Sequence, residues 1–200
     1  MSNLATKETF IEQDGNLYVV PGFFPVAQAE HYLNRLHDTI PWQTETITMF
    51  GRAHQVPRLV SWHGDPDAYY TYSGVGHRPQ PWSPELQEIR NHLQIDTGQT
   101  FNSVLANLYR DGNDHMGWQS DSEAELGPNP WIASMSFGAQ RIFSVQHKRH
   151  KRTLKIPLSA GSLLVMHGPL QKNWRHCLRK TKQNCGIRIN LTYRLICTSM

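Results

Sequence analysis

Residues 187–196, near the end of the chain, alternate between apolar and polar side chains. The polar members are Arg188, Asn190, Thr192 and Arg194. Successive side chains of a β-strand point to opposite faces, so in a strand these four would share one face. Two guanidiniums that flank two short hydrogen-bonding groups suit a dicarboxylate ligand, because arginine binds carboxylate oxygens in a bidentate manner. An ordinary antiparallel edge strand with its polar face in water gives the same alternation and is the alternative interpretation.

Other stretches carry residues that could bind a ligand or a metal. The strand-like segment 103–109 places Asn107 and Tyr109 on one face. Asp121 and Glu123 follow a turn-forming stretch, and His176 shortly precedes the final strand. An isolated acidic pair is more often part of a solvated loop, and a single histidine among eleven is weak evidence by itself. On the residues alone, both the functional and the structural interpretations stay open.

These residues need a scaffold that is mainly strand. Apolar residues at helical spacing predict a helix over about residues 26–40, and Ser83 as N-cap with Pro84 at the first helical position predicts a second helix. Both helices are expected to cover a sheet, and the fold class is mainly β, an antiparallel double sheet with flanking helices. The expected strands are 16–20, 44–50, 58–62, 69–72, 103–109, 131–137, 141–146, 153–157, 162–166 and 186–196.

Length and composition indicate one domain in an intracellular, soluble protein. The 200 residues suit a single domain over 15–200, preceded by a flexible segment 1–14. Three cysteines without CxxC spacing favour a reducing compartment, the cytoplasm or nucleus, and no stretch is apolar enough to cross a membrane. The net charge of +4 includes the basic run 147–152, which is either a solvated loop or a contact for a polyanion such as nucleic acid.

Several motifs together resemble the AlkB family of Fe(II)- and 2-oxoglutarate-dependent dioxygenases, in particular the animal DNA-repair homologues and bacterial members similar to them. The strongest is the Arg-x-Asn-x-Thr-x-Arg pattern of residues 188–194. The others are Asn107-Leu108-Tyr109, the segment around Asp121, Trp174-Arg175-His176, Phe50-Gly51-Arg52, Val56-Pro57-Arg58, Tyr70-Thr71-Tyr72-Ser73-Gly74 and Phe101-Asn102. The resemblance spans about residues 15–196 and implies a double-stranded β-helix, or jelly roll.

The resemblance also implies a cofactor set and roles for individual residues. Fe(II) is held in this family by a His-x-Asp pair and a distant histidine, a facial triad with open positions for 2-oxoglutarate and O2. Asp121 would be the carboxylate ligand and His176 the distant histidine, and both would be catalytic. The implied contacts of 2-oxoglutarate are Arg188 and Arg194 on its carboxylates, assisted by Asn107, Tyr109, Asn190 and Thr192. In the family reaction an N-methyl group of a base is hydroxylated, and its carbon leaves as formaldehyde.

The first metal ligand departs from the family pattern. The histidine of His-x-Asp falls on Gln119, whose neutral amide oxygen is a poor ligand for ferrous iron. His115 lies in the same stretch at the wrong offset, and a shifted register would displace Asp121. Three explanations stay open: an introduced inactivating change, a natural enzyme with weak iron binding, or a lineage that binds alkylated DNA without repairing it.

The substrate side is expected in hairpins at about residues 43–74. Because chemistry on a base of a duplex requires base flipping, Phe50 is expected to fill the gap, although a core phenylalanine is the alternative. Tyr70 and Tyr72 resemble the stacking wall and Glu123 the acid that faces the base, while Arg58 and the run 147–152 would contact phosphates. The expected function is dealkylation of DNA, possibly RNA, by a monomer. The rivals are a catalytically silent lesion-binding protein and a family member that acts on RNA or protein.

Overall fold

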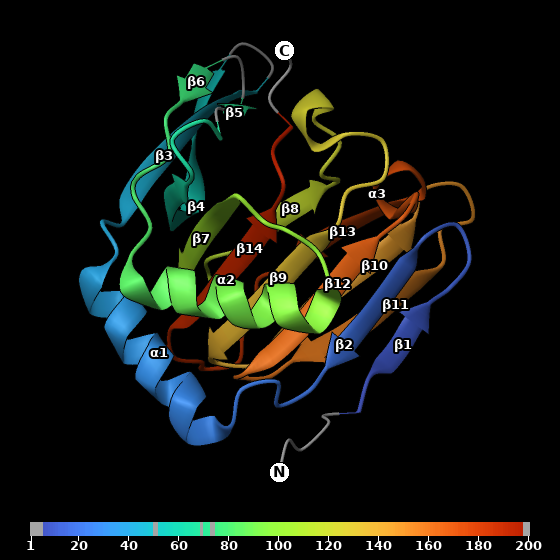
Figure 1. Ribbon diagram of the computed structural model, residues 1–200. Helices are drawn as coiled ribbons and strands as arrows, with labels where there is room; N and C mark the ends of the chain where they lie inside the picture. The colour runs from blue at the N-terminus through green and yellow to red at the C-terminus, as the bar shows by residue number, and fades with distance from the viewer. Residues whose placement is uncertain (1–5, 50–51, 69, 73–74, 198–200) are drawn as a thin grey trace.

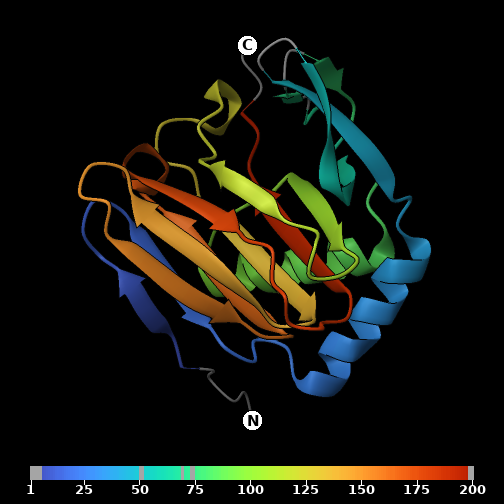
Figure 2. The ribbon, with the colours of Figure 1, turned by 180° about the vertical axis from the view of Figure 1, so that it is seen from behind.

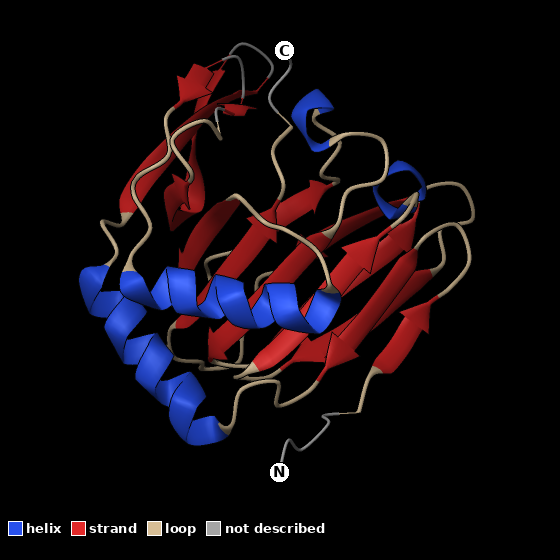
Figure 3. Cartoon of the chain, viewed as in Figure 1, coloured by secondary structure: helices blue, strands red, loops and turns tan. Residues whose placement is uncertain are grey.

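The computed structural model describes residues 6–49, 52–68, 70–72 and 75–197, and for residues 47–49, 52, 70–72 and 75–77 it describes the backbone alone. Two antiparallel sheets lie face to face, and two long helices cover the outer face of the larger one (Figure 1, Figure 3). In spatial order the larger sheet contains β1 (Glu8–Ile11), β2 (Asn16–Val20), β12 (Ser162–His167), β9 (Ile132–Gly138), β14 (Arg188–Arg194), β7 (Ser103–Tyr109), β4 (Arg52–Gly64) and β3 (Gln43–Met49).

The smaller sheet lies behind the larger one when the helices face the viewer, and in front when the molecule is turned (Figure 2). Its strands, in spatial order, are β11 (Thr153–Leu158), β10 (Arg141–His147), β13 (Trp174–Leu178) and β8 (Met116–Gln119). The remaining elements are the β5–β6 hairpin (Tyr70–Tyr72, Val75–His77), the short helix α3 (Leu170–Asn173) and a 3-10 turn (Ala124–Leu126). This double-sheet arrangement confirms the predicted jelly roll.

The two long helices form as the sequence predicts. α1 (Val26–Thr39) buries the apolar face that starts at Ala29, and α2 (Pro84–Thr97) begins where the Ser83 side chain accepts a hydrogen bond from the Leu86 N–H. Tyr193 of β14 ties the larger sheet to α2, because its buried hydroxyl donates to the Leu86 carbonyl at 2.9 Å. Apolar residues between the helices and this sheet form one core, and a second core lies between the two sheets.

One expectation about the strands was wrong, and one alternative interpretation is excluded. The N-terminal segment is not loose throughout, because β1 pairs with β2 although only Ile11 of its four residues is buried. The last strand is not an edge strand with a polar face in water: β14 lies between β9 and β7, and all seven of its residues are buried. Its apolar face packs toward the helices, so its polar face lies between the two sheets.

The other predicted strands exist with shifted ends, and β4 extends well beyond the expected 58–62. β3 and β4 form an antiparallel hairpin within the expected 43–74 region. The short strands β8 and β13 were not predicted. No helix of the described residues is long and apolar enough to cross a membrane.

The turn from β9 into β10 begins at a glycine that lies against the start of β14. Gly138 has φ +80°, and a Cβ atom there would collide with the backbone carbonyl of Ile187, the residue before β14. We expect Gly138→Ala to lower the free energy of unfolding by about 1 to 3 kcal/mol through backbone strain. Gly186→Ala is the matched control, because a Cβ atom there meets nothing within 4 Å. Urea denaturation of both variants tests this, and equal stability would show that the turn yields freely.

Candidate active site

The polar face of β14 carries the four residues that the sequence singled out. Asn190 lies opposite Asn107 of β7 and donates to the Ser134 hydroxyl of β9 at 2.8 Å, while the Thr192 hydroxyl donates to the Asn190 side-chain oxygen at 3.1 Å. Tyr109 lies opposite Arg188, whose guanidinium stands 5.3 Å from the centre of the tyrosine ring. The seven-residue strand thus places two cations at the ends of a buried hydrogen-bonded row.

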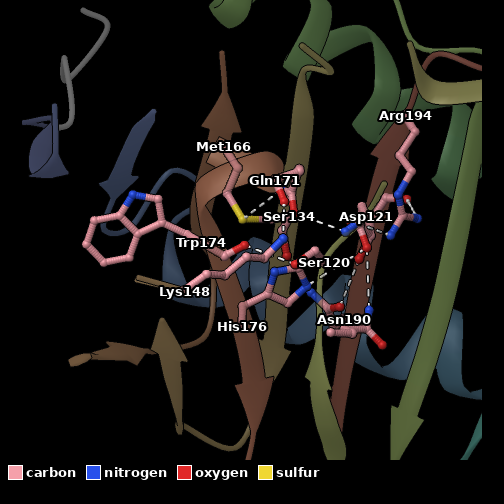
Figure 4. A network of polar contacts seen from close by, with 12 residues as sticks. Ser120, Asp121, Ser134, Lys148, Met166, Gln171, Trp174, His176, Asn190 and Arg194 are labelled. Atoms are coloured by element: carbon pink, nitrogen blue, oxygen red, sulfur yellow. Dashed lines mark hydrogen bonds and ion pairs between the residues drawn. The ribbon is translucent and has the colours of Figure 1, made fainter. Parts of the chain in front are cut away.

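Asp121 and His176 converge on the Arg194 end of this row (Figure 4). Arg194 Nη2 lies 3.0 Å from Asp121 Oδ2, and His176 Nε2 lies 3.9 Å from Asp121 Oδ1. The side chains of all three residues are at least nine-tenths buried. Gln119 pairs with His176 across β8 and β13, and its amide Nε2 donates to Asp121 Oδ1 at 3.4 Å. Gln119, Asp121 and His176 are therefore brought together, as predicted.

The charges at this cluster are set by burial and by Arg194. Burial by itself would raise the pKa of Asp121, but Arg194, and after it His176, outweigh burial and hold the pKa of this carboxyl below its usual value. Burial lowers the pKa of His176, against the attraction of Asp121 and with the help of the cations Arg194 and Lys148. The cluster is therefore a carboxylate beside a neutral imidazole, the protonation states in which both groups bind metals.

Two of the three side chains fit a metal, and the third fits poorly. Asp121 Oδ1 and His176 Nε2 are a carboxylate and an imidazole donor that face the same space. These two side chains offer a metal one imidazole and one carboxylate. The other ring nitrogen of His176, Nδ1, is buried without a hydrogen-bond partner among the described residues. Gln119 turns its amide N–H toward Asp121, and an N–H cannot donate electrons to a metal. Among the described residues, no three His, Cys, Asp or Glu side chains form a metal-binding group.

Arg188 is a buried cation without an acid. Its residue is 2% exposed, its Nη2 donates to the Ser136 hydroxyl at 3.0 Å, and its Nε has no partner. No carboxylate of the described residues lies within 4.0 Å of it. Burial, opposed by Tyr109 and assisted by Arg141, lowers the pKa of Arg188 to about 10. An anionic ligand would stabilise a guanidinium in this position, because an unpaired buried charge is costly.

The substrate-side predictions fared unevenly. Arg58 is buried and its Nε donates to Asn107 Oδ1 at 2.7 Å, so the expected phosphate contact was wrong: the guanidinium is held inside the sheet. Glu123 lies shortly after Asp121 in the sequence, and its Oε2 is buried without a hydrogen-bond partner among the described residues. Tyr70 and Tyr72 lie on β5, but their side chains, like all of Phe50, lie outside what the structure describes.

Sequence reasoning missed the residues that support these groups. Ser134 and Ser136 of β9 hold Asn190 and Arg188, and their alternation within the apolar stretch 131–137 was a usable signal for a polar face. Gln171 of α3 accepts a hydrogen bond from the Asp121 backbone N–H at 3.0 Å. No periodicity marks Gln171, because it lies in a helix of four residues.

The lowered pKa of His176 makes a prediction about stability. The ordinary pKa of the histidine, 6.5, applies to the unfolded chain. Below this pH the unfolded chain binds a proton at His176 that the folded chain does not. The contribution of His176 to the free energy of unfolding is therefore present above about pH 6.5 and is lost as the pH falls below it. We expect urea denaturation to show a fall in the free energy of unfolding from about pH 7.5 to 5.5. The fall should be smaller in His176→Gln, which keeps all other histidines. Equal falls would mean that folding does not lower the pKa of His176.

Comparisons with known proteins identify the family to which the chain belongs. The profile of the 2OG-Fe(II) oxygenase superfamily matches residues 16–194. Human "Alpha-ketoglutarate-dependent dioxygenase alkB homolog 3" is 39% identical over 186 residues, which cover 88% of this chain and 64% of that protein. Human "DNA oxidative demethylase ALKBH2" is 41% identical over 184 residues, 86% of this chain and 70% of that protein. The chain thus spans about two thirds of the length of these relatives.

A solved structure supports the fold. "The structure of OsALKBH1" superposes with a TM-score of 0.64 at 16% sequence identity, covering 92% of this chain and 99% of that one. At this low sequence identity, the match supports the jelly-roll fold and nothing further. Because the profile runs from residue 16 to residue 194 and the human relatives are 39% and 41% identical, the chain belongs to the 2OG-Fe(II) oxygenase superfamily and, within it, to the AlkB family.

Proposed function

We propose that this chain carries out oxidative dealkylation of N-alkylated bases in nucleic acid, with alkylated DNA as its substrate. The observation that carries the proposal is Arg188, a buried guanidinium without a carboxylate partner among the described residues, on the same strand face as Arg194. A dicarboxylate cosubstrate would supply the missing anion. The names of the human relatives, an alpha-ketoglutarate-dependent dioxygenase and a DNA oxidative demethylase, support 2-oxoglutarate and DNA.

Each residue of the site then has a task. Asp121 and His176 would hold Fe(II), with Gln119 at the third position. Arg194 engages Oδ2 of Asp121 and leaves Oδ1 facing His176. Burial favours the neutral form of the His176 imidazole, the form that can bind a metal. Arg188 would bind one carboxylate of 2-oxoglutarate, beside Tyr109. Iron and O2, when bound, supply the oxidation through which the alkyl carbon is lost.

The basic turn 147–152 offers the phosphate contacts that Arg58 does not. His147 is buried and its Nδ1 accepts the backbone N–H groups of Arg149 and His150, so its Nε2 carries the hydrogen and donates to Asp14. Lys148 is bonded to the Gln171 carbonyl. The four remaining residues of the turn, 149–152, are exposed. Because Gln171 also contacts Asp121, this cationic turn lies near the proposed metal site. There it would contact a phosphate backbone without reading the base sequence.

The base itself would be held by residues of which the structure says little. Phe50 would fill the gap left by a flipped base, and Tyr70 and Tyr72 would stack on that base. Glu123, whose buried Oε2 lacks a partner among the described residues, would face it. A catalytically silent lesion-binding protein is not favoured, because the curated relatives are named for the reaction.

Binding of 2-oxoglutarate tests the role of Arg188. We expect Arg188→Met to weaken the binding of 2-oxoglutarate in the presence of Mn(II) by about 2 to 5 kcal/mol, the typical loss when one member of a buried charge pair is removed. Calorimetry measures this, and circular dichroism checks that the variant folds. Arg149→Met removes an exposed guanidinium from the basic turn and serves as the control. If Arg188→Met binds 2-oxoglutarate like the parent chain, the assignment of the cosubstrate site is wrong.

Restoring an imidazole at position 119 tests the metal site and the reaction. Loss of even an indirect partner of a metal ligand typically costs about 10- to 100-fold in affinity or activity, so we expect Gln119→His to bind Fe(II) at least about tenfold more tightly. The variant should also release more formaldehyde from DNA that carries N-methylated bases.

The control for this experiment is His115→Gln, introduced into the Gln119→His chain. His115 is the histidine nearest in sequence, and its Nδ1 contacts the Asn113 carbonyl rather than the metal cluster. This change should leave Fe(II) binding as it was. If the parent chain already releases formaldehyde as fast as Gln119→His, the metal is not held by residues 119, 121 and 176.

A further inference from the structure

The loop that carries Asp121 is anchored to the segment that contains α3 (Figure 4). The Asp121 backbone N–H donates to Gln171 Oε1 at 3.0 Å, and the hydroxyl of Ser120 donates to the Trp174 carbonyl at 3.0 Å. Arg194 holds the far end of the Asp121 side chain. Asp121 is therefore fixed at two points, its backbone nitrogen and its Oδ2, and these two points determine where Oδ1 lies.

Gln171 is itself buried and is held by contacts with Met166 and Lys148. It is 4% exposed, its Nε2 lies 3.6 Å from the Met166 sulfur, and its backbone carbonyl accepts a hydrogen bond from Lys148 Nζ at 2.7 Å. The Lys148 backbone N–H also donates to the Asn173 carbonyl at 2.8 Å. The last carbonyls of a helix lack partners within it, and Lys148 satisfies those of Gln171 and Asn173.

The Asp121 backbone N–H requires a hydrogen-bond acceptor, and the Gln171 side chain is long enough to supply one. A backbone N–H can only donate, so the orientation of the Gln171 amide is set: Oε1 faces Asp121 and Nε2 faces Met166. An apolar side chain would leave the buried Asp121 N–H unpaired, which is unfavourable. Gln171 does not reach the metal position through its own side chain in any described contact, so it acts through Asp121.

We propose that Gln171 is a positioning residue of the metal site: its side-chain oxygen sets the position of the Asp121 carboxylate toward His176, and Lys148 holds Gln171 in place. This inference rests on the proposed function, because it assigns Asp121 to a metal. It adds that the exposed basic turn, through Lys148, and the metal ligand, through Asp121, are bonded to the same residue.

The test uses three variants in the Gln119→His chain. Gln171→Met keeps the length of the side chain but removes the acceptor. Gln171→Glu keeps an acceptor at the same reach. Asn173→Leu is the matched control, since the Asn173 amide of the same helix donates to the carbonyls of Asp14 and Pro169, away from Asp121. Mn(II) affinity is measured by calorimetry, the thermal midpoint by circular dichroism, and hydrogen exchange of the Asp121 amide by NMR.

We expect Gln171→Met to bind Mn(II) about tenfold more weakly, the lower end of the usual loss for an indirect partner of a metal ligand. The Asp121 amide should exchange about tenfold faster, as for the loss of one buried hydrogen bond. Gln171→Glu should restore slow exchange, and Asn173→Leu should change neither measurement. A purely structural role would instead lower the thermal midpoint in Gln171→Met and Asn173→Leu alike, with Mn(II) affinity unchanged.

Either of two results overturns the proposal. One is slow Asp121 exchange in Gln171→Met, which would show that the contact does not protect the amide. The other is unchanged Mn(II) affinity in a folded Gln171→Met chain. Hydrogen exchange needs no metal, so failure of the proposed function, seen as no Mn(II) binding by the Gln119→His chain itself, is distinguished from failure of the contact.

Discussion

The structure depends on two guanidiniums buried on one face of β14. An unpaired buried charge is costly, and the two arginines differ in whether a carboxylate pairs with them. Arg194 is matched by the Asp121 carboxylate at 3.0 Å. Arg188 has the Ser136 hydroxyl, a tyrosine ring and no acid among the described residues. The fold thus holds one complete ion pair and one cation prepared for an anion, which is the asymmetry expected of a ligand site.

The sheet supplies the rigidity that this arrangement requires. β14 is paired on both sides, and the Tyr193 hydroxyl ties its apolar face to α2. Because a strand alternates its side chains, the contacts that bury Ile189, Leu191 and Tyr193 also force the polar residues toward the smaller sheet. A one-residue slip would reverse both faces at once, so the register that stabilises the core also places the arginines. Stability and site geometry therefore share one cause.

The sequence predicted this part of the molecule well, because alternation over residues 187–196 and helical spacing in α1 and α2 are strong local signals. It failed where the deciding contact is not local. Arg58 looked like a surface cation, but the pairing of β4 with β7 places it against Asn107. β1 has one buried residue, and β8 has four residues without a clear alternation, so neither has a readable pattern. Gln171 and Lys148 meet only because the 147–152 turn lies against α3, a packing relation that no spacing encodes.

The position of Gln119 separates the requirements of the fold from those of the chemistry. Its amide N–H satisfies Asp121 Oδ1, and its backbone pairs with His176, so the strand contact between β8 and β13 does not need an imidazole. The charge of Asp121 is balanced by Arg194 whether or not a metal is present. A glutamine in place of a histidine therefore leaves the cluster assembled and its charges balanced, and what changes is the electron pair offered to a metal. For this reason we expect residue 119 to set the affinity for iron through its donor atom rather than through the architecture of the site.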